Sequence, residues 1–212
     1  SDGLAAGKGV VISFNKKESI QFTKEILDGK FKNSNKVVIE EFLEGEEASY
    51  FVITDGKNYL PLGTAQDHKR IGENDTGLNT GGMGAYSPSL LITDALQEKI
   101  NKKIIEPTIK GLNAIGCSFV GILYAGLMIK DNEPKLIEYN IRFGDPECQV
   151  LMMRLENDLL DLILSIKNKS LQKQKISWKK NPCITVVAAA TGYPEKYKTK
   201  TEIKNLGNIK NN

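Results

Sequence analysis

The chain has 212 residues, of which 40% are hydrophobic and 26% charged, a composition that excludes a disordered or fibrous protein. Its 29 basic and 26 acidic residues are interspersed and leave a net charge of +3, so we expect no nucleic-acid and no membrane partner. The three cysteines are far apart and form no CxxC pair. We therefore expect neither a disulfide framework nor a zinc site, and a cytoplasmic location.

The first part of the chain predicts a loop, a strand and a helix. Small residues at 1–9 predict a loop that runs into a strand at 10–12. Asn15 and Glu18 have the spacing of a capping box, so a helix should begin after Asn15. Gly29 marks the C-terminal end that we expect for this helix.

The next segments predict strands and a long loop. The apolar tract 36–43 predicts a buried strand. Asp55-Gly56 is a strong turn signal, and it predicts a hairpin between strands at 50–54 and 58–63. Residues 66–88 have no apolar period and many glycines, which indicates a long functional loop.

The second half of the chain mixes helices with another hairpin. In order, we expect a helix capped by Thr93, strands at 119–129 and 135–140, one helix from Pro146 through Leu162, a polar linker at 167–181 and a strand from Cys183. Hairpins among helices predict an α+β fold and argue against a doubly wound parallel sheet.

The sharpest chemical signal lies on the strand that ends at Asn140. Side chains alternate between the faces of a strand, so Glu138, Asn140 and Arg142 should share one face. A carboxylate and an amide oxygen suit Mg²⁺ that carries phosphates, and Arg142 would add a positive fork beside them. A half-exposed strand with a polar face is the alternative, and the motif alone leaves both open.

Three further segments carry weaker signals. The small-residue loop with Lys8 could close around a phosphate, although it matches no P-loop and could be a plain tight turn. Glu40 lies in an apolar tract, where it should accept a donor such as an adenine amino group, while Glu47 could accept ribose hydroxyls. A solvated acidic rim is the alternative. Asp67 is a possible amine acceptor, and its neighbour His68 is more often structural than catalytic.

Longer strings resemble the glycinamide ribonucleotide synthetases, also named phosphoribosylamine–glycine ligases, of the ATP-grasp superfamily. The resemblance covers residues 2 to about 206. It rests on five strings in order: DGLAAGKG at 2–9, EEFLEGEEAS at 40–49, QDHKR at 66–70, NTGGMGAYSP at 79–88 and RFGDPE at 142–147.

This resemblance implies an α+β ATP-grasp fold, in which two α+β subdomains grip ATP before a β-rich C-terminal domain begins. Residues 1–43 would be the C-terminal part of the lid subdomain, and residues 44–175 the main subdomain with the metal site. Residues 176–212 would be a linker and the truncated start of the C-terminal domain. We therefore expect a fragment that lacks the N-terminal domain and is inactive by itself.

The implied activity joins glycine to 5-phosphoribosylamine through a glycyl phosphate, giving glycinamide ribonucleotide, ADP and phosphate in purine biosynthesis. The resemblance implies Glu138 and Asn140 as ligands of Mg²⁺ or Mn²⁺, and Arg142, Asp145 and Asp67 as catalytic residues. The implied ATP-binding residues are Gly7, Lys8, Gly9, Glu40, Glu41, Phe42, Leu43 and Glu47. The glycine-rich stretch at 79–84 should lie near the amine substrate.

Two other functions stay open. A different ATP-grasp carboxylate–amine ligase is the first, although the strings at 66–70 and 79–88 disfavour it. A non-catalytic nucleotide-binding fragment is the second.

Overall fold

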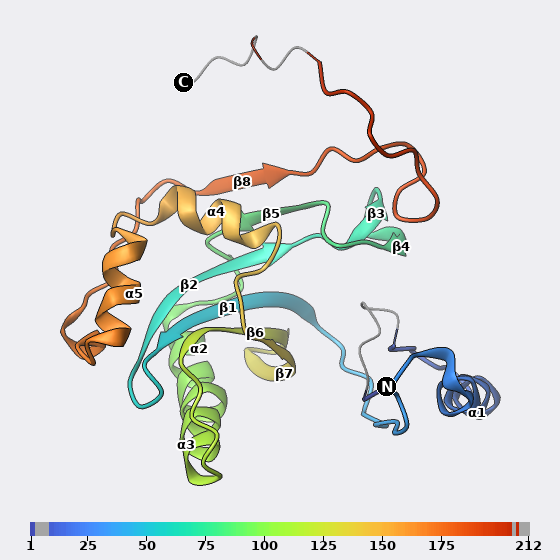
Figure 1. Cartoon of the computed structure of the whole chain (residues 1–212), viewed down its shortest axis with the longest axis horizontal. Coiled ribbons are helices and arrows are strands. Elements are labelled where there is room, and N and C mark those ends of the chain that lie inside the picture. The colour runs from blue at the N-terminus through green and yellow to red at the C-terminus, as the bar shows by residue number, and fades with distance from the viewer. Residues whose placement is uncertain (3–8, 205–206, 208–212) are drawn as a thin grey trace. The chain divides into compact units, whose positions relative to one another are not determined.

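The computed structural model describes residues 1–2, 9–204 and 207 (Figure 1). The chain divides into two compact units, Ser1–Glu44 and Gly45–Asn212, and each is described by itself. Among the described residues, no helix has the length and apolar character needed to cross a membrane.

The first unit contains the helix predicted after Asn15. This helix is α1 (Lys16–Glu25), which continues into the π-helical turn η1 (Ile26–Lys30). The side chain of Asn15 accepts a hydrogen bond from the backbone N of Glu18 at 3.0 Å, which confirms the predicted cap. Gly29 has a φ of 93°, a conformation that glycine adopts without strain, at the predicted end of the helix.

The strands predicted at 10–12 and 36–43 are wrong for this structure. The described part of Ser1–Glu44 contains no strand, and Val38 and Ile39 are 68% and 89% exposed. An apolar tract becomes a strand only where a neighbouring strand satisfies its backbone hydrogen bonds. The described residues of this unit supply no such neighbour.

The second unit is built on an antiparallel six-stranded sheet in the order β7-β6-β1-β2-β5-β8. Its strands are β1 (Glu46–Thr54), β2 (Tyr59–Asp67), β5 (Gly84–Ser87), β6 (Gly121–Lys130), β7 (Glu133–Asn140) and β8 (Cys183–Val186). The predicted turn at Asp55-Gly56 connects β1 to β2, and a turn at Asp131-Asn132 connects β6 to β7. Asp131 and Asn132 have φ values of 52° and 58°, as a tight hairpin turn requires.

Helices cover both faces of the sheet (Figure 1). The helices α2 and α3 lie on one face, and α4 and α5 lie on the other. Strand β1 is buried on both sides, since Tyr50 and Val52 join the core beneath α2 while Phe51 and Ile53 join the core beneath α4. The helical segments are α2 (Asp94–Ile100), η2 (Asn101–Ile105), α3 (Glu106–Ala114), α4 (Glu147–Arg154), α5 (Leu159–Lys167) and η3 (Leu171–Lys173).

The helix predicted after Thr93 is confirmed, because the Thr93 hydroxyl accepts from the backbone N of Leu96 at 3.2 Å. Two lysines of this helical segment also reach the β6–β7 turn. Lys99 and Lys103 contact the carboxylate of Glu133 at 2.6 and 2.7 Å. These exposed ion pairs tie α2 and η2 to the end of the sheet.

The single long loop predicted at 66–88 is wrong. This region contains the end of β2, a small hairpin of β3 (Arg70–Gly72) and β4 (Thr76–Asn79), and the strand β5. Apolar periodicity is missing because every residue of β3 and β4 is exposed. The hairpin extends beyond the main sheet in Figure 1.

The single helix predicted from Pro146 through Leu162 is also wrong, because α4 and α5 are separate helices. The chain leaves the helical conformation at Leu155, and Asp158 then caps α5 by accepting from the backbone N of Leu160 at 2.7 Å. The following tract, predicted as a polar linker, is not purely polar. Leu171 is fully buried in the core and Trp178 packs against it.

Arg154 fastens the segment before β8 to the sheet. Its buried guanidinium donates to the Ser87 hydroxyl at 2.9 Å and to the carbonyl oxygens of Lys179 and Asn181 at 3.2 Å each. It also lies 5.4 Å from the centre of the Trp178 ring. Neutral acceptors and an aromatic face thus surround this buried cation.

The boundary expected between residues 175 and 176 stays a prediction. In this structure β8 follows that position and pairs with β5 along its whole length.

Candidate functional site

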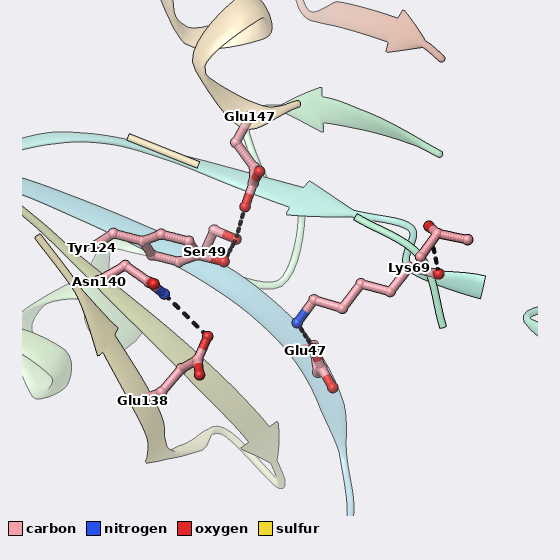
Figure 2. Close-up of polar contacts among 8 residues, drawn as sticks. Glu47, Ser49, Lys69, Tyr124, Glu138, Asn140 and Glu147 are labelled. Atoms are coloured by element: carbon pink, nitrogen blue, oxygen red, sulfur yellow. Dashed lines mark hydrogen bonds and ion pairs between the residues drawn. The ribbon is translucent and has the colours of Figure 1, made fainter. Parts of the chain in front are cut away.

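Polar side chains line a shallow pocket on the face of the sheet that α4 covers (Figure 2). The register explains why they meet, because Ser49 of β1 lies opposite Gly126 of β6, and Gly126 lies opposite Glu138 of β7. Gly126, in the middle of this row, has no side chain and leaves the floor of the pocket open. Asp67 at the end of β2 completes the wall beside Glu47.

Lys69 is the cation of this pocket. Its Nζ lies 2.7 Å from Glu47 Oε2 (Figure 2). Burial by itself would lower the pKa of Lys69, but the carboxylates of Asp67, Glu47 and Glu138 together raise the pKa above its usual value. Lys69 therefore stays an ammonium ion at neutral pH.

Asp67 titrates close to neutral pH. Burial raises the pKa of Asp67 to about 6; Lys69 opposes this rise, and the carboxylates of Glu147 and Glu47 add to it. A carboxyl group with such a pKa can take up a proton at one stage of a reaction and release it at another.

A buried chain of hydrogen bonds lies above the pocket, as Figure 2 shows. Glu147, Ser49 and Tyr124 are 2%, 1% and 6% exposed. Ser49 Oγ donates to Glu147 Oε1 at 3.2 Å, and Tyr124 Oη lies 2.9 Å from Ser49 Oγ. Because the single hydroxyl proton of Ser49 points to Glu147, Tyr124 must donate to Ser49.

This chain of hydrogen bonds is held in place by its surroundings. Burial, and next the carboxylate of Glu147, raises the pKa of Tyr124 above its ordinary value, so its hydroxyl remains a donor. A Cβ atom at Gly144 would come 2.4 Å from Glu147 Cδ, so glycine at 144 leaves room for the carboxylate.

The structure brings Glu138, Asn140 and Arg142 together. Asn140 Nδ2 donates to Glu138 Oε1 at 3.0 Å (Figure 2), and Arg142 Nη2 donates to Asn140 Oδ1 at 3.5 Å. Glu138 and Asn140 thus lie on one face of β7, as expected, whereas Arg142 follows the end of the strand and contacts Asn140 from there.

The donor set of Glu138 and Asn140 fits Mg²⁺ or Mn²⁺. A half-turn of the Asn140 amide would direct its oxygen to the point that the Glu138 carboxylate faces, giving two hard oxygen ligands. No group of three or more His, Cys, Asp or Glu side chains suited to a metal occurs in the described part of the chain. A pair of protein ligands suits a cation that keeps waters and phosphate oxygens in its shell.

Other predicted site residues lie elsewhere. Asp145 is exposed in the turn before α4, and its Oδ1 accepts from Gln149 Nε2 at 2.8 Å, so it does not line the pocket. Gly7 and Lys8 lie outside the described residues. Gly9 is buried in the first unit, where its carbonyl accepts from the N-terminus at 2.9 Å.

The predicted adenine-binding residues are all in the first unit. Glu40, Glu41 and Phe42 are exposed and Leu43 is partly exposed. The argument that Glu40 is a costly buried carboxylate is wrong, because an exposed carboxylate keeps its hydration. Its proposed role then depends on the resemblance alone.

Lys69, Glu147, Ser49 and Tyr124 were not predicted individually. Lys69 and Glu147 lie within the strings at 66–70 and 142–147, which could have identified them. Ser49 and Tyr124 are 75 residues apart in sequence and meet only through the pairing of β1 with β6. No short-range pattern predicts that contact.

The family model and the curated relatives agree on one family. The family model for the phosphoribosylglycinamide synthetase ATP-grasp (A) domain matches residues 1–148. The phosphoribosylamine–glycine ligase of Brucella melitensis is 53% identical over 97% of this chain and 48% of its own length. That of Vigna unguiculata is 52% identical over 97% of this chain and 68% of its own length.

A solved structure extends this likeness to three dimensions. The crystal structure of phosphoribosylamine–glycine ligase from Thermotoga maritima is 34% identical, with a TM-score of 0.80. The match covers 93% of this chain and 50% of that one. The chain thus spans about half the length of several proteins that it resembles.

Proposed function

Because the chain belongs to the phosphoribosylglycinamide synthetase family, through its ATP-grasp domain, we propose that it forms the ATP- and metal-binding part of a glycine ligase. The reaction joins glycine to 5-phosphoribosylamine and yields glycinamide ribonucleotide, ADP and phosphate. The observation that carries this proposal is the pocket that Glu138, Lys69 and Asp67 line together, with Asn140 hydrogen-bonded to Glu138. It combines a divalent-cation site with a proton acceptor, as the two halves of the reaction require.

In the first half-reaction, a glycine carboxylate oxygen attacks the γ-phosphorus of ATP, the bond from that phosphorus to the bridging oxygen breaks, and ADP leaves. Glu138 and Asn140 would hold Mg²⁺ or Mn²⁺, which when bound neutralises charge on the phosphate oxygens. Arg142, whose guanidinium lies next to the Asn140 amide, would hold the transferred phosphoryl group. The ammonium of Lys69 would add positive charge from the opposite wall.

In the second half-reaction, the amine nitrogen of 5-phosphoribosylamine attacks the carbonyl carbon of glycyl phosphate, and phosphate leaves. The nitrogen must lose a proton as the new C–N bond forms. Asp67 is the acceptor that we assign, because its pKa of about 6 lets its carboxylate take up that proton near neutral pH.

We further propose that the first unit contributes the nucleotide contacts, through Gly7, Lys8, Gly9 and the tract 40–43. The exposure of Phe42 supports this role, since an apolar ring without cover in its own unit is available to a purine base. Glu47 would accept the ribose hydroxyls from the edge of the pocket. Its pairing with Lys69 keeps its carboxylate close to that edge.

The test uses the full-length protein and measures phosphate release with glycine and 5-phosphoribosylamine omitted in turn. We expect stoichiometric glycinamide ribonucleotide and phosphate only when ATP, a divalent cation and both substrates are present. Turnover with a different carboxylate or amine, and none with this pair, would overturn the proposal.

The matched variants are Glu138→Gln and Glu133→Gln, which remove carboxylates from opposite ends of β7. Only the first should reduce metal-dependent turnover, by at least about 100-fold. Equal activity of the two variants would remove Glu138 from the metal site.

A further inference from the structure

The glycine-rich segment 79–84, named the Gly loop from here on, has little side-chain packing of its own. Gly82 has a φ of 122°, and a Cβ atom there would come 2.4 Å from Pro146 Cδ. A stretch with so few side chains keeps one conformation only when neighbouring groups hold its backbone.

One anchor of the Gly loop is the backbone directly after Asp67. Thr80 donates to the Lys69 carbonyl through its backbone N at 2.7 Å and through its hydroxyl at 2.8 Å. The backbone N of Met83 donates to the His68 carbonyl at 2.7 Å. The Gly loop is therefore held by three hydrogen bonds to the segment directly after the proposed proton acceptor.

The second anchor comes from the far end of the chain. The backbone N of Val187, just after β8, donates to the Met83 carbonyl at 2.9 Å. The hydroxyl of Tyr193 then accepts a hydrogen bond from the backbone N of Gly81 at 2.9 Å. Tyr197 supports this tyrosine by an edge-on ring contact, with the centroids 5.5 Å apart.

The position of the Gly loop associates it with the amine substrate, 5-phosphoribosylamine, more than with glycine or ATP. It is bonded to residues that follow β2, and Asp67 is at the end of β2. Glu138 and Asn140, assigned to metal and phosphates, lie on β7, and two strands separate β7 from β2 in the sheet. A disturbance of the Gly loop should therefore act most strongly at Asp67 and on the amine substrate, while it leaves the β7 residues Glu138 and Asn140 in place.

We propose that Tyr193 is a positioning residue for 5-phosphoribosylamine, acting through the hydrogen bond from its hydroxyl to Gly81 and thus through the Gly loop. This inference rests on the proposed function. It assigns to the segment after β8 a part in substrate recognition, in addition to its packing against the sheet.

The experiment compares Tyr193→Phe with Tyr197→Phe in the full-length protein. Both variants remove one hydroxyl from the same pair of edge-on rings, but among the hydrogen bonds of the described residues it is the Tyr193 hydroxyl that accepts from the Gly loop. The KM values for 5-phosphoribosylamine, glycine and ATP are measured separately, together with the melting temperature.

We expect Tyr193→Phe to raise the KM for 5-phosphoribosylamine about fivefold, which corresponds to about 1 kcal/mol. The other two KM values should change less than about twofold. Tyr197→Phe should leave all three unchanged, and both variants should melt as the wild type does. Equal changes in all three KM values, no change in any, or the same effect from Tyr197→Phe would overturn the proposal.

A second variant changes the same contact between Gly81 and Tyr193, but from the side of the Gly loop. Gly81→Ala would place a Cβ atom 3.3 Å from the Tyr193 hydroxyl oxygen. It should raise the same KM in the wild type and add little in the Tyr193→Phe background, whereas full additivity would contradict the proposed coupling. Failure of the proposed function is seen separately, because the unmodified protein would then form no glycinamide ribonucleotide.

Discussion

Replacement of Asp67 by asparagine should make this chain more stable while it removes the proposed proton acceptor. Asp67 is partly buried beside Glu47 and Glu147, and Lys69 offsets only part of the resulting penalty. A carboxyl group whose pKa is higher in the folded state destabilises that state wherever it must be ionised. Asparagine has nearly the same shape and carries no charge, so it avoids this penalty.

The magnitude follows from the pKa of about 6 in the folded chain against an ordinary value of 3.8. This difference of about two pH units corresponds to an upper limit of about 3 kcal/mol. As the pH falls from 6 to 4, the folded state binds the proton before the unfolded state does, so the wild type gains stability. Below about pH 4 both states are protonated and the advantage of asparagine should vanish.

The assay is urea unfolding of the 212-residue chain at pH 7.5 and pH 4, with EDTA present so that no divalent cation offsets the acidic cluster. We expect Asp67→Asn to raise the free energy of unfolding by about 1–3 kcal/mol at pH 7.5 and by little at pH 4. Asp161→Asn makes the same chemical change at an exposed position and should have no such effect. An asparagine variant that is less stable at pH 7.5, or a gain that is equal at both pH values, would refute the reasoning.

In the full-length protein, Glu138→Gln should weaken calorimetric binding of Mg·ATP and remove metal-dependent turnover. Glu40→Ala should weaken ATP more than glycine, measured as separate KM values. Arg154→Met should lower the free energy of unfolding by about 2–4 kcal/mol in urea, because the buried Ser87 hydroxyl and two partly buried carbonyl oxygens lose their donor. The hydrogen bonds from Lys103 and Lys99 lower the pKa of Glu133 to about 2. The stabilisation of the folded state by these two ion pairs is therefore present above about pH 4.5 and is lost as the pH falls towards 2. The melting temperature of Glu133→Gln should therefore approach that of the wild type at low pH and in 1 M salt.

Features set by nearby residues were predictable from the sequence. The cap at Asn15, the cap at Thr93 and the turn at Asp55-Gly56 each depend on side chains within a few residues. The shared face of Glu138 and Asn140 follows from strand geometry alone. The α+β ATP-grasp fold implied by the family resemblance is confirmed by the family model and by the solved relative.

Features that depend on distant partners were missed. The tract 36–43 looks like a strand because it is apolar, yet pairing is a property of its neighbours. The exposed hairpin within 66–88 has no apolar alternation for a pattern search to find. Ser49 belongs to the string at 40–49, but Tyr124 and its contact with Ser49 became recognisable only when the register placed them beside Glu147.

The candidate site destabilises the folded state, whereas the apolar core beneath it stabilises that state. Glu47, Asp67 and Glu138 lie around Lys69, and Glu147 lies near Asp67, an arrangement whose carboxylates repel one another and raise the pKa of Asp67. The strand β1 offsets this, because its apolar side chains are buried on both faces of the sheet and fix the register of β6 and β2 on either side. Disruption of that register by one residue would move Ser49 and Glu47 to the opposite face. The buried core of β1 therefore keeps the acidic side chains close together, although their carboxylates repel one another.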